Sequence, residues 1–258
     1  MTIKLLDNTE HNIKDLEQKC YSDEFYYGYL GKAAFSSSAL KLLLDSPKTY
    51  HYITKYGQEQ NSQALRDGWL FHTMMLEPEK IDDVVFVDVQ SKNTKKFKEA
   101  KLEYPDVFTM KEKNDSERLV DAMSKNNTAM ELMRDSVTEI PAIGNLQGYP
   151  FRAKADVLKN AGGLVDLKTT IDVKNFDKSA SKYRYYLQVY IYCKLFGVDY
   201  KDFKFLCIDK KNLDIAVWDV SKDFYERGEQ EVAKAIKIYE HYKSDAFDIN
   251  DFIIEGTL

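Results

Sequence analysis

The stretch from Tyr149 to Thr170, YPFRAKADVLKNAGGLVDLKTT, constrains the fold of this chain more than any other. Apolar and β-branched residues lie on both sides of a cluster of turn-forming residues at Lys159 to Gly163. Two extended segments around a glycine-containing turn are typical of a β-hairpin. The stretch therefore predicts two adjacent antiparallel strands.

Three charged side chains belong to this predicted hairpin. Asp156 lies on the first strand, and Asp166 and Lys168 lie two residues apart on the second, so the latter two share one face of a pleated strand. Burying a carboxylate is unfavourable unless a cation compensates, which favours a divalent-metal site with an attendant lysine. An ordinary solvent-facing strand also alternates Asp and Lys with Val and Leu, and the hairpin alone does not separate the two interpretations.

The composition is that of an ordinary globular protein, with 258 residues of which 31% are charged and 44% hydrophobic. No repeat, low-complexity tract or linker marks a boundary, so we expect one domain over residues 1–258, with a core at about 62–220 and an N-terminal helical addition. The N-terminus lacks a secretory pattern, and no apolar run is long enough to cross a bilayer. Cys20, Cys193 and Cys207 are few and far apart. We expect a cytoplasmic protein, with no disulfide and no cysteine-rich metal site.

The net charge of −5 argues against a large nucleic-acid-binding surface, because phosphate binding needs a local basic region. The clearest basic segment runs from Ser91 to Lys113. Such a segment either contacts a polyanion or is an ordinary solvated face. Its seven lysines are Lys92, Lys95, Lys96, Lys98, Lys101, Lys111 and Lys113.

The remaining segments predict a mixed order of helices and strands. Capping residues, apolar periodicity, prolines and glycines mark the helix ends, and short β-branched runs mark the strands. Residues 1–31 show no clear period and predict an extended or irregular entry segment. The expected helices are Ser36 to Asp45, Ser62 to Leu76, Asn114 to Arg134, Lys174 to Phe196 and Lys222 to Tyr242. The expected strands are Asp82 to Val89, Ser136 to Ile143, the two strands of the hairpin, Lys204 to Ile208 and Asp214 to Trp218, with a turn from Gly144 to Gly148.

Two features of the predicted helices admit more than one role. His72 lies among apolar neighbours, where a lone histidine is more often a hydrogen-bonded core residue than a ligand. Ser36, Ser37 and Ser38 precede an apolar helix and predict an N-cap. The same hydroxyls and free N–H groups are compatible with an anion site for a phosphate.

The order of elements and of polar residues resembles the PD-(D/E)XK nuclease superfamily, in particular its RecB-like and RecE-like exonuclease branch, which includes phage exonucleases similar to lambda exonuclease. The likeness covers roughly residues 35–206. Gly68 to His72 matches the G-x-x-x-H of a preceding helix, Asp156 the motif aspartate, Asp166-Leu167-Lys168 the D-x-K, and Gln188 to Tyr192 the Q-x-x-x-Y of the next helix. Ala155 replaces the proline of the superfamily name, and the cysteines of the iron–sulfur subgroup are absent.

The resemblance implies an α/β fold with a restriction-endonuclease-like core, in which a central mixed β-sheet with a meander is flanked by helices. It also implies a Mg²⁺ or Mn²⁺ site whose ligands are His72, Asp156, Asp166 and the carbonyl of Leu167. Lys168 would orient or deprotonate the attacking water, and Gln188 and Tyr192 would support the site or contact DNA. Likeness to lambda exonuclease further implies that Ser38 contacts a 5′ phosphate. The guanidinium of Arg66 would suit it as a bidentate partner for the same phosphate.

The function implied is a metal-dependent deoxyribonuclease, foremost a double-strand DNA exonuclease acting 5′ to 3′ in recombination or repair. Such enzymes often work as ring-shaped homo-oligomers that pass a 3′ tail to a single-strand annealing protein. The alternatives are a single-strand or structure-specific nuclease of the same fold and a non-catalytic DNA-binding relative. No membrane association is expected.

Overall fold

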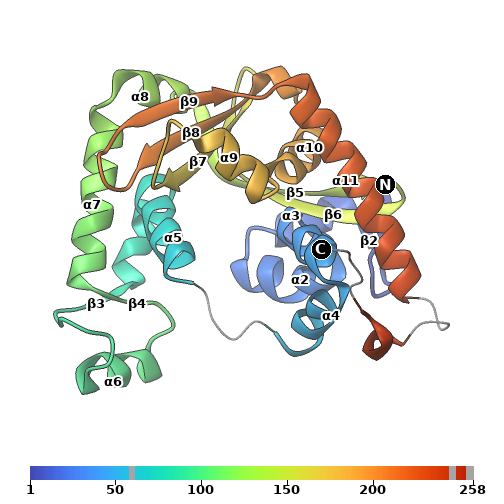
Figure 1. Ribbon diagram of the computed structural model, residues 1–258, viewed down its shortest axis with the longest axis horizontal. Helices are drawn as coiled ribbons and strands as arrows, with labels where there is room; N and C mark the ends of the chain where they lie inside the picture. Colours follow the sequence, from blue (N-terminus) through green and yellow to red (C-terminus); the bar gives the residue numbers. More distant parts are fainter. Residues whose placement is uncertain (58–61, 244–247, 254–258) are drawn as a thin grey trace, which may run out of the picture.

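The computed structural model describes residues 1–57, 62–243 and 248–253 of the chain. A five-stranded mixed sheet forms its centre, with helices on both faces (Figure 1). This is the α/β architecture expected of a restriction-endonuclease-like core. The strands of the sheet are β5 (Ser136–Leu146), β6 (Tyr149–Lys159), β7 (Leu164–Thr170), β8 (Phe203–Asp209) and β9 (Ile215–Asp219), in that spatial order.

The first three strands form the predicted antiparallel meander, β8 joins β7 in parallel, and β9 closes the sheet antiparallel to β8. The turn between β5 and β6 is narrower than the expected Gly144 to Gly148, since Gln147 and Gly148 alone connect the strands. Both residues have positive φ, at 51° and 87°, as a two-residue turn that follows the twist of its strands requires.

The predicted hairpin forms, with Gly162 and Gly163 at positive φ in its turn. Its two strands pair only over Val157 with Val165 and Leu158 with Leu164. Beyond this short ladder β6 stays with β5, while β7 continues along β8. The hairpin strands therefore part just where Asp156 and Asp166 lie.

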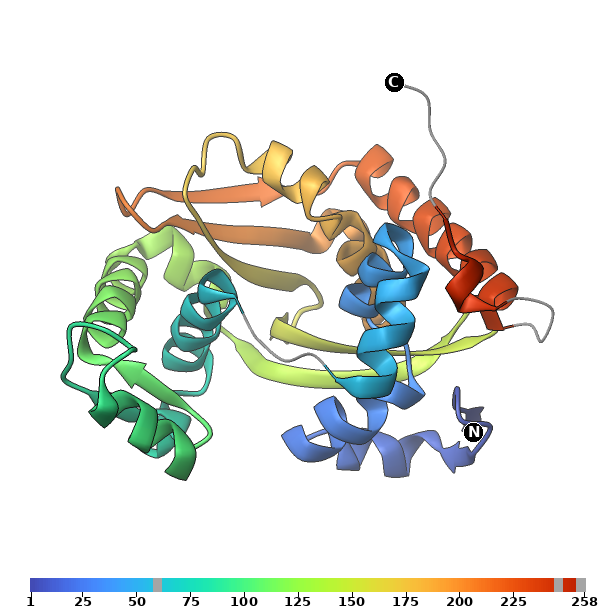
Figure 2. The ribbon, with the colours of Figure 1, turned by 60° about the horizontal axis from the view of Figure 1, so that its bottom comes forward.

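Helices cover the two faces of the sheet through alternate residues of the strands. On one face Phe71, Leu119 and Met123 pack against Val165 and Leu167. On the other face a second cluster joins Leu164, Phe205 and Cys207 to helical residues that include Phe176, Val189 and Cys193. Figure 2 shows α5 and α7 at one end of the sheet and α3 and α4 at the other. The helices that contribute are α3 (Ser37–Asp45), α4 (Pro47–Tyr56), α5 (Gln63–Leu76), α7 (Met110–Lys125), α8 (Asn127–Met133), α9 (Phe176–Lys182), α10 (Tyr185–Phe196) and α11 (Lys222–Lys243).

Two predicted helices are each divided in the structure. The helix expected over Lys174 to Phe196 breaks between α9 and α10 at Arg184, which has a left-handed backbone with φ 54°. The Arg184 guanidinium pairs with Asp45 of α3 and Glu231 of α11, so contacts distant in sequence hold the break. The helix expected over Asn114 to Arg134 begins earlier and divides at Asn126, whose side chain caps α8 by accepting from Ala129 N–H.

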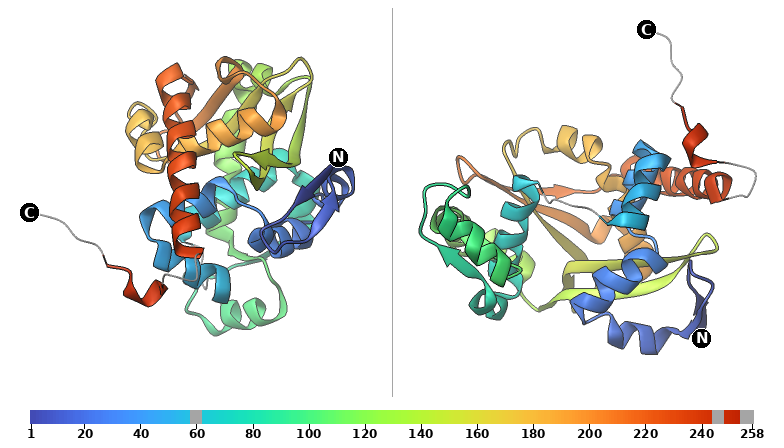
Figure 3. Two further views of the ribbon diagram at one scale, coloured as in Figure 1. Left: turned by 90° about the vertical axis from the view of Figure 1, so that its right-hand side faces the viewer. Right: turned by 90° about the horizontal axis from the view of Figure 1, so that it is seen from below.

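The expectation of an extended or irregular entry segment over residues 1–31 was wrong for most of its length. Residues 1–33 form a small hairpin and short helices that pack under β5 and β6 (Figure 3), because Ile3, Leu16 and Leu30 share a buried cluster with Ile143 of β5. Buried Arg152 of β6 donates to the carbonyl oxygen of Tyr26. The elements are β1 (Thr2–Lys4), β2 (Glu10–Asn12), α1 (Ile13–Lys19), the π-helix η1 (Glu24–Tyr29) and α2 (Leu30–Ala33).

A small insertion lies between α5 and α7. Its two strands pair in parallel. The predicted strand over Asp82 to Val89 is confirmed only in its central part, Val85–Val87. The insertion consists of η2 (Pro78–Asp83), β3 (Val85–Val87), α6 (Lys95–Glu103) and β4 (Val107–Thr109).

The short 3-10 helices η3 (Tyr200–Asp202) and η4 (Ile249–Asp251) complete the described elements. None of the described helices is both long and apolar enough to cross a membrane.

Candidate active site

The separation of β6 from β7 exposes a backbone donor that Asp156 satisfies. The Oδ2 atom of Asp156 accepts a hydrogen bond of 2.7 Å from the N–H of Leu167. A carboxylate thus replaces the missing rung of the ladder, and it lies beside the backbone of the D-x-K segment. This contact holds the first predicted ligand at the point where the strands part.

Asp166 and Lys168 of β7 share a strand face, as their spacing predicted. The Asp166 side chain is buried, and it forms an ion pair with the Lys168 ammonium. It also accepts a hydrogen bond from Nε2 of Gln188 on α10. The ammonium lies 4.9 Å from the centre of the Tyr185 ring, at the start of the same helix. The D-x-K pair and the first residue of the Q-x-x-x-Y pattern therefore form one cluster.

The remaining residues of that pattern and the predicted histidine also reach the site. His72 of α5 is half-buried, with Nδ1 3.5 Å from Oδ2 of Asp156. Tyr192 lies one turn after Gln188 on α10, and burial raises the pKa of its phenol well above the ordinary value. His72 is thus brought to the two aspartates rather than held in an apolar core, while its role as a metal ligand stays a prediction.

Burial is the main influence on the charges at this site. It raises the pKa of Asp156 and of Asp166 to about 6, against the opposing effect of Lys168. It lowers the pKa of His72 to about 4, and the charge of Lys168 adds to that effect. Burial alone would lower the pKa of Lys168, but Asp166 and Asp156 outweigh it and raise that pKa. At neutral pH the imidazole is therefore neutral and able to bind a metal, and the ammonium is charged.

The donor set at the strand separation fits a divalent cation. His72, Glu139 and Asp156 each offer one ligand atom, and these atoms lie within 4.8 Å of one another. Two carboxylate oxygens and one imidazole nitrogen suit Mn²⁺ well and are compatible with Mg²⁺. Glu139 of β5 belongs to this group, although it lies in none of the motifs that the sequence suggested.

The family comparison agrees with this arrangement. A family model described as "PDDEXK-like domain of unknown function (DUF3799)" matches residues 36–248, which is most of the chain. The chain belongs to this family. The superfamily expected from the motifs is thereby shown, while the lambda-exonuclease-like branch stays a prediction.

Structural comparison gives the same fold for this PDDEXK-like protein. The crystal structure of a "Putative exonuclease" from Eubacterium rectale aligns over 92% of this chain and 95% of that chain, with a TM-score of 0.62 and 15% identity. The crystal structure of SSO0001 aligns over 80% of this chain and 76% of that chain at 14% identity, but its TM-score of 0.37 is too low to support an argument. A search of curated proteins finds no match.

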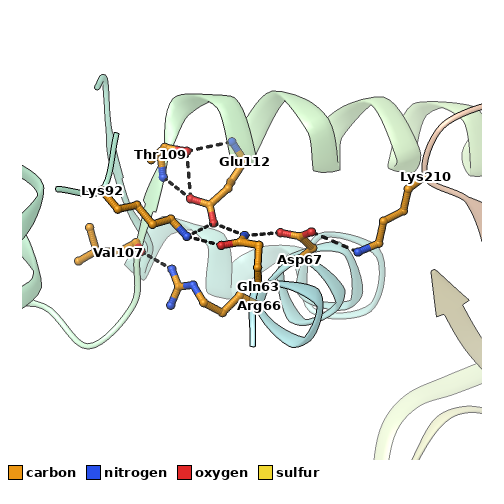
Figure 4. A network of polar contacts seen from close by, with 8 residues as sticks. All are labelled: Gln63, Arg66, Asp67, Lys92, Val107, Thr109, Glu112 and Lys210. Carbon is orange, nitrogen blue, oxygen red and sulfur yellow. Dashed lines mark hydrogen bonds and ion pairs between the residues drawn. The ribbon is translucent and has the colours of Figure 1, made fainter. Parts of the chain in front are cut away.

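The sequence suggested that Ser38 and Arg66 act together, and the structure shows what each lies beside. Ser36, not Ser38, is the N-cap of α3, and its hydroxyl accepts from the N–H of Ala39. The guanidinium of Arg66 donates to the carbonyl of Val107 at 2.5 Å and lies 4.2 Å from the centre of the Phe108 ring. These contacts turn Arg66 toward β4 (Figure 4), so nothing in the geometry supports its pairing with Ser38. A 5′-phosphate contact by either residue stays a prediction.

A network of polar contacts around Gln63 and Asp67 links α5, the helix that carries His72, to α7 and to Lys210 (Figure 4). Glu112 of α7 accepts from Lys92 and Gln63, and Asp67 of α5 accepts from Gln63 and Lys210. Lys92 is thus engaged within the protein rather than free for a polyanion. Lys95 and Lys113 of the basic segment also pair with acids. Lys95, Lys96, Lys98, Lys101 and Lys111 are exposed.

Glu139 was missed from the sequence, although the register contains a signal for it. Counted outward from the turn at Gln147 and Gly148, Glu139 and Asp156 are both eight residues away. Thr138 pairs with Val157 and Ile140 with Ala155, so Glu139 lies opposite Asp156. The signal could not be used because the turn was expected to be wider.

We expect the stability of the metal-free protein to report the titration of Glu139. Burial, with Asp156 and Glu77 adding to it, raises the pKa of Glu139 to about 8, whereas a glutamate in an unfolded chain titrates at about pH 4.3. Between these values the folded wild type holds the extra proton, so its stability falls as the pH rises. The side chain of Glu139→Gln does not titrate. Between pH 4.5 and 8 the free energy of unfolding of this variant should therefore rise relative to that of the wild type by more than about 1 kcal/mol, the equivalent of one pKa unit.

Urea unfolding in EDTA at a series of pH values measures this difference. Exposed Glu131, which pairs with Arg134 at the surface, is replaced by glutamine as the control for the loss of a carboxylate elsewhere in the protein. A constant difference between Glu139→Gln and the wild type would show that Glu139 titrates normally.

Proposed function

We propose that this protein is a divalent-metal-dependent deoxyribonuclease, and that its main activity is exonucleolytic digestion of double-stranded DNA from the 5′ end. The observation that carries the proposal is the joining of Asp166, Lys168 and Gln188 in one largely buried cluster beside Asp156 and His72. A largely buried lysine paired with a carboxylate has no obvious structural use that an apolar pair would not serve better. Membership of the PDDEXK-like family supports a nuclease.

The residues of the site would each have a separate role in phosphodiester hydrolysis. A divalent cation, when bound, lowers the pKa of a bound water and neutralises charge on the phosphate. Asp156, Asp166, His72 and the Leu167 carbonyl are the groups that would hold it. Because the pKa of Lys168 is raised, its ammonium is suited to orienting the nucleophile and stabilising negative charge, rather than to removing a proton at neutral pH. Gln188 fixes Asp166, and Tyr192 lies behind it on the same helix face.

A specific observation also favours a single-stranded or frayed end as substrate. Tyr27 of η1 and Tyr183 before α10 are exposed by 60% and 44% of their surface. The Lys154 ammonium lies 5.0 Å from the centre of the Tyr27 ring, and the Glu139 carboxylate helps to raise the pKa of Tyr27. Tyr183 packs on Tyr185, beside Lys168. Exposed aromatic rings beside a phosphate site can stack unpaired bases. Single-strand nuclease activity is therefore the second candidate function.

The wider assembly belongs to the proposal as well. The acidic chain would bind duplex ends as a ring-like homo-oligomer in which exposed lysines face the DNA, and would transfer the remaining 3′ strand to an annealing protein. Its operation in the cytoplasm of a bacterial or phage-infected cell follows from that role.

Incubation with linear DNA labelled at the 5′ or the 3′ end tests the proposal. We expect release of the 5′ label from duplex as short products with Mg²⁺ or Mn²⁺, and no release in EDTA. Faster digestion of single strands than of duplex would favour the second candidate. No digestion of either substrate by folded protein in either metal would refute a nuclease function.

A further inference from the structure

The carboxylate of Glu139 is directed at the active site from a strand that carries no recognised motif. Its ligand atom lies within 4.8 Å of those of His72 and Asp156. The residue has a left-handed backbone with φ 53° in the middle of β5, a conformation that is unfavourable for a side chain other than glycine and that tends to occur at functional sites. The ladder on both sides of it, at Thr138 and Ile140, is regular.

The neighbouring cations are already engaged by other acids. Lys80 pairs with Asp23 and Glu77, and Lys154 pairs with Asp23. Among the residues that the structure describes, the Glu139 carboxylate has neither a hydrogen bond nor an ion pair. It lies opposite Asp156, and Lys154 and Lys80 act on it only at a distance longer than that of an ion pair.

The other acids of the site differ from Glu139 in this respect. Asp166 is held by Lys168 and Gln188, and Asp156 accepts from the N–H of Leu167. Fully ionised, Glu139, Asp156 and Asp166 carry three negative charges against the single charge of Lys168, so a dication would balance the cluster. The imidazole of His72 completes a mixed oxygen and nitrogen donor set.

We propose that Glu139 is a metal ligand, which together with His72 and Asp156 completes a cation position beside the Asp166–Lys168 pair. This inference rests on the proposed nuclease function, because it adds a ligand to the same site. It extends the ligand set from the motif-bearing helix and hairpin to strand β5.

Direct titration of the metal-free full chain with Mn²⁺, by calorimetry and by the electron paramagnetic resonance of free Mn²⁺, tests the proposal. We expect Glu139→Gln to weaken the binding of one Mn²⁺ by roughly tenfold or more, since even residues that only support metal ligands alter affinity by about 10- to 100-fold. Glu77→Gln is the matched control, because Glu77 is a nearby carboxylate paired with Lys80. Its affinity for Mn²⁺ should stay close to that of the wild type, because Glu77 contributes no ligand atom to the group of His72, Glu139 and Asp156.

Circular dichroism and urea unfolding establish that each variant is folded. Glu139→Gly provides a second variant, because glycine adopts a positive φ without strain, and it should show the same loss of Mn²⁺ binding. In a His72→Ala background, Glu139→Gln should weaken Mn²⁺ binding little further, as expected for two ligands of one ion.

The two proposals can fail independently. Unchanged Mn²⁺ affinity in both Glu139 variants would overturn the ligand assignment, even if the wild type digests DNA. Weakened affinity in these variants, with no DNA digestion by the wild type, would support the metal position and refute the nuclease function.

Discussion

Replacing Lys168 by alanine is expected to abolish DNA hydrolysis. The ammonium pairs with buried Asp166, and it is the cation that the described part of the chain supplies to Asp166 and Asp156. Loss of a group that stabilises charge in the transition state costs roughly 10²- to 10³-fold in rate. The initial rate of digestion of end-labelled duplex, at saturating metal, measures the effect, and Asp166→Ala should reduce that rate at least as much.

The stability of these variants must be measured alongside the rate. Removing one partner of a buried ion pair leaves an uncompensated charge, which is destabilising by about 3–5 kcal/mol. Lys168→Gln retains most of the side-chain volume and separates loss of chemistry from loss of fold. Lys204→Ala on the adjacent strand is the matched control, because Lys204 pairs with exposed Asp219 at the surface, and this variant should keep the wild-type rate. A folded Lys168 or Asp166 variant with more than about a tenth of the wild-type rate would contradict the assignment.

Gly228→Ala is expected to cause the largest loss of stability of any conservative change considered. Gly228 lies where α11 crosses α10, and a Cβ atom there would come within 2.1 Å of the carbonyl oxygen of Tyr186 and 2.8 Å of Cβ of Tyr190. Neither contact is possible without moving one helix away from the other, because the obstacle includes backbone. Forced overpacking usually costs about 1–3 kcal/mol, and this rigid case should reach or exceed about 3 kcal/mol. Chemical denaturation of the metal-free protein measures the loss.

The control for this prediction is Gly28→Ala. A Cβ atom at Gly28 meets nothing within 4 Å, so the same chemical change should alter the free energy of unfolding little. Similar stabilities for Gly228→Ala and the wild type would mean that α10 and α11 are less closely packed than the structure indicates. Figure 3 shows α11 running past the helices that cover the sheet. Moving α11 away from α10 would disturb the large buried cluster that both helices share.

The sequence could predict the parts of the site that depend on local spacing. Asp166 and Lys168 are two residues apart on one strand, and period-two geometry alone puts them on one face. Gln188 and Tyr192 are four apart on one helix, where the period of 3.6 residues does the same. The hairpin turn followed from its glycines, and the serine caps from their chemistry. His72 was brought into the prediction only by the order of motifs, since its spacing in an apolar helix favoured a core residue.

The tertiary structure alone decided which residues from different elements meet. Arg66 is suitable for binding a phosphate by its chemistry, yet its guanidinium is engaged by Val107 and Phe108. Arg184 divides a helix that the sequence predicted to be continuous, because its partners come from α3 and α11. Glu139 joins His72 and Asp156 only because a two-residue turn sets the register of β5 on β6. Periodicity describes one element at a time, whereas the balance of buried charge is determined by contacts between elements, and these exist only in the folded chain.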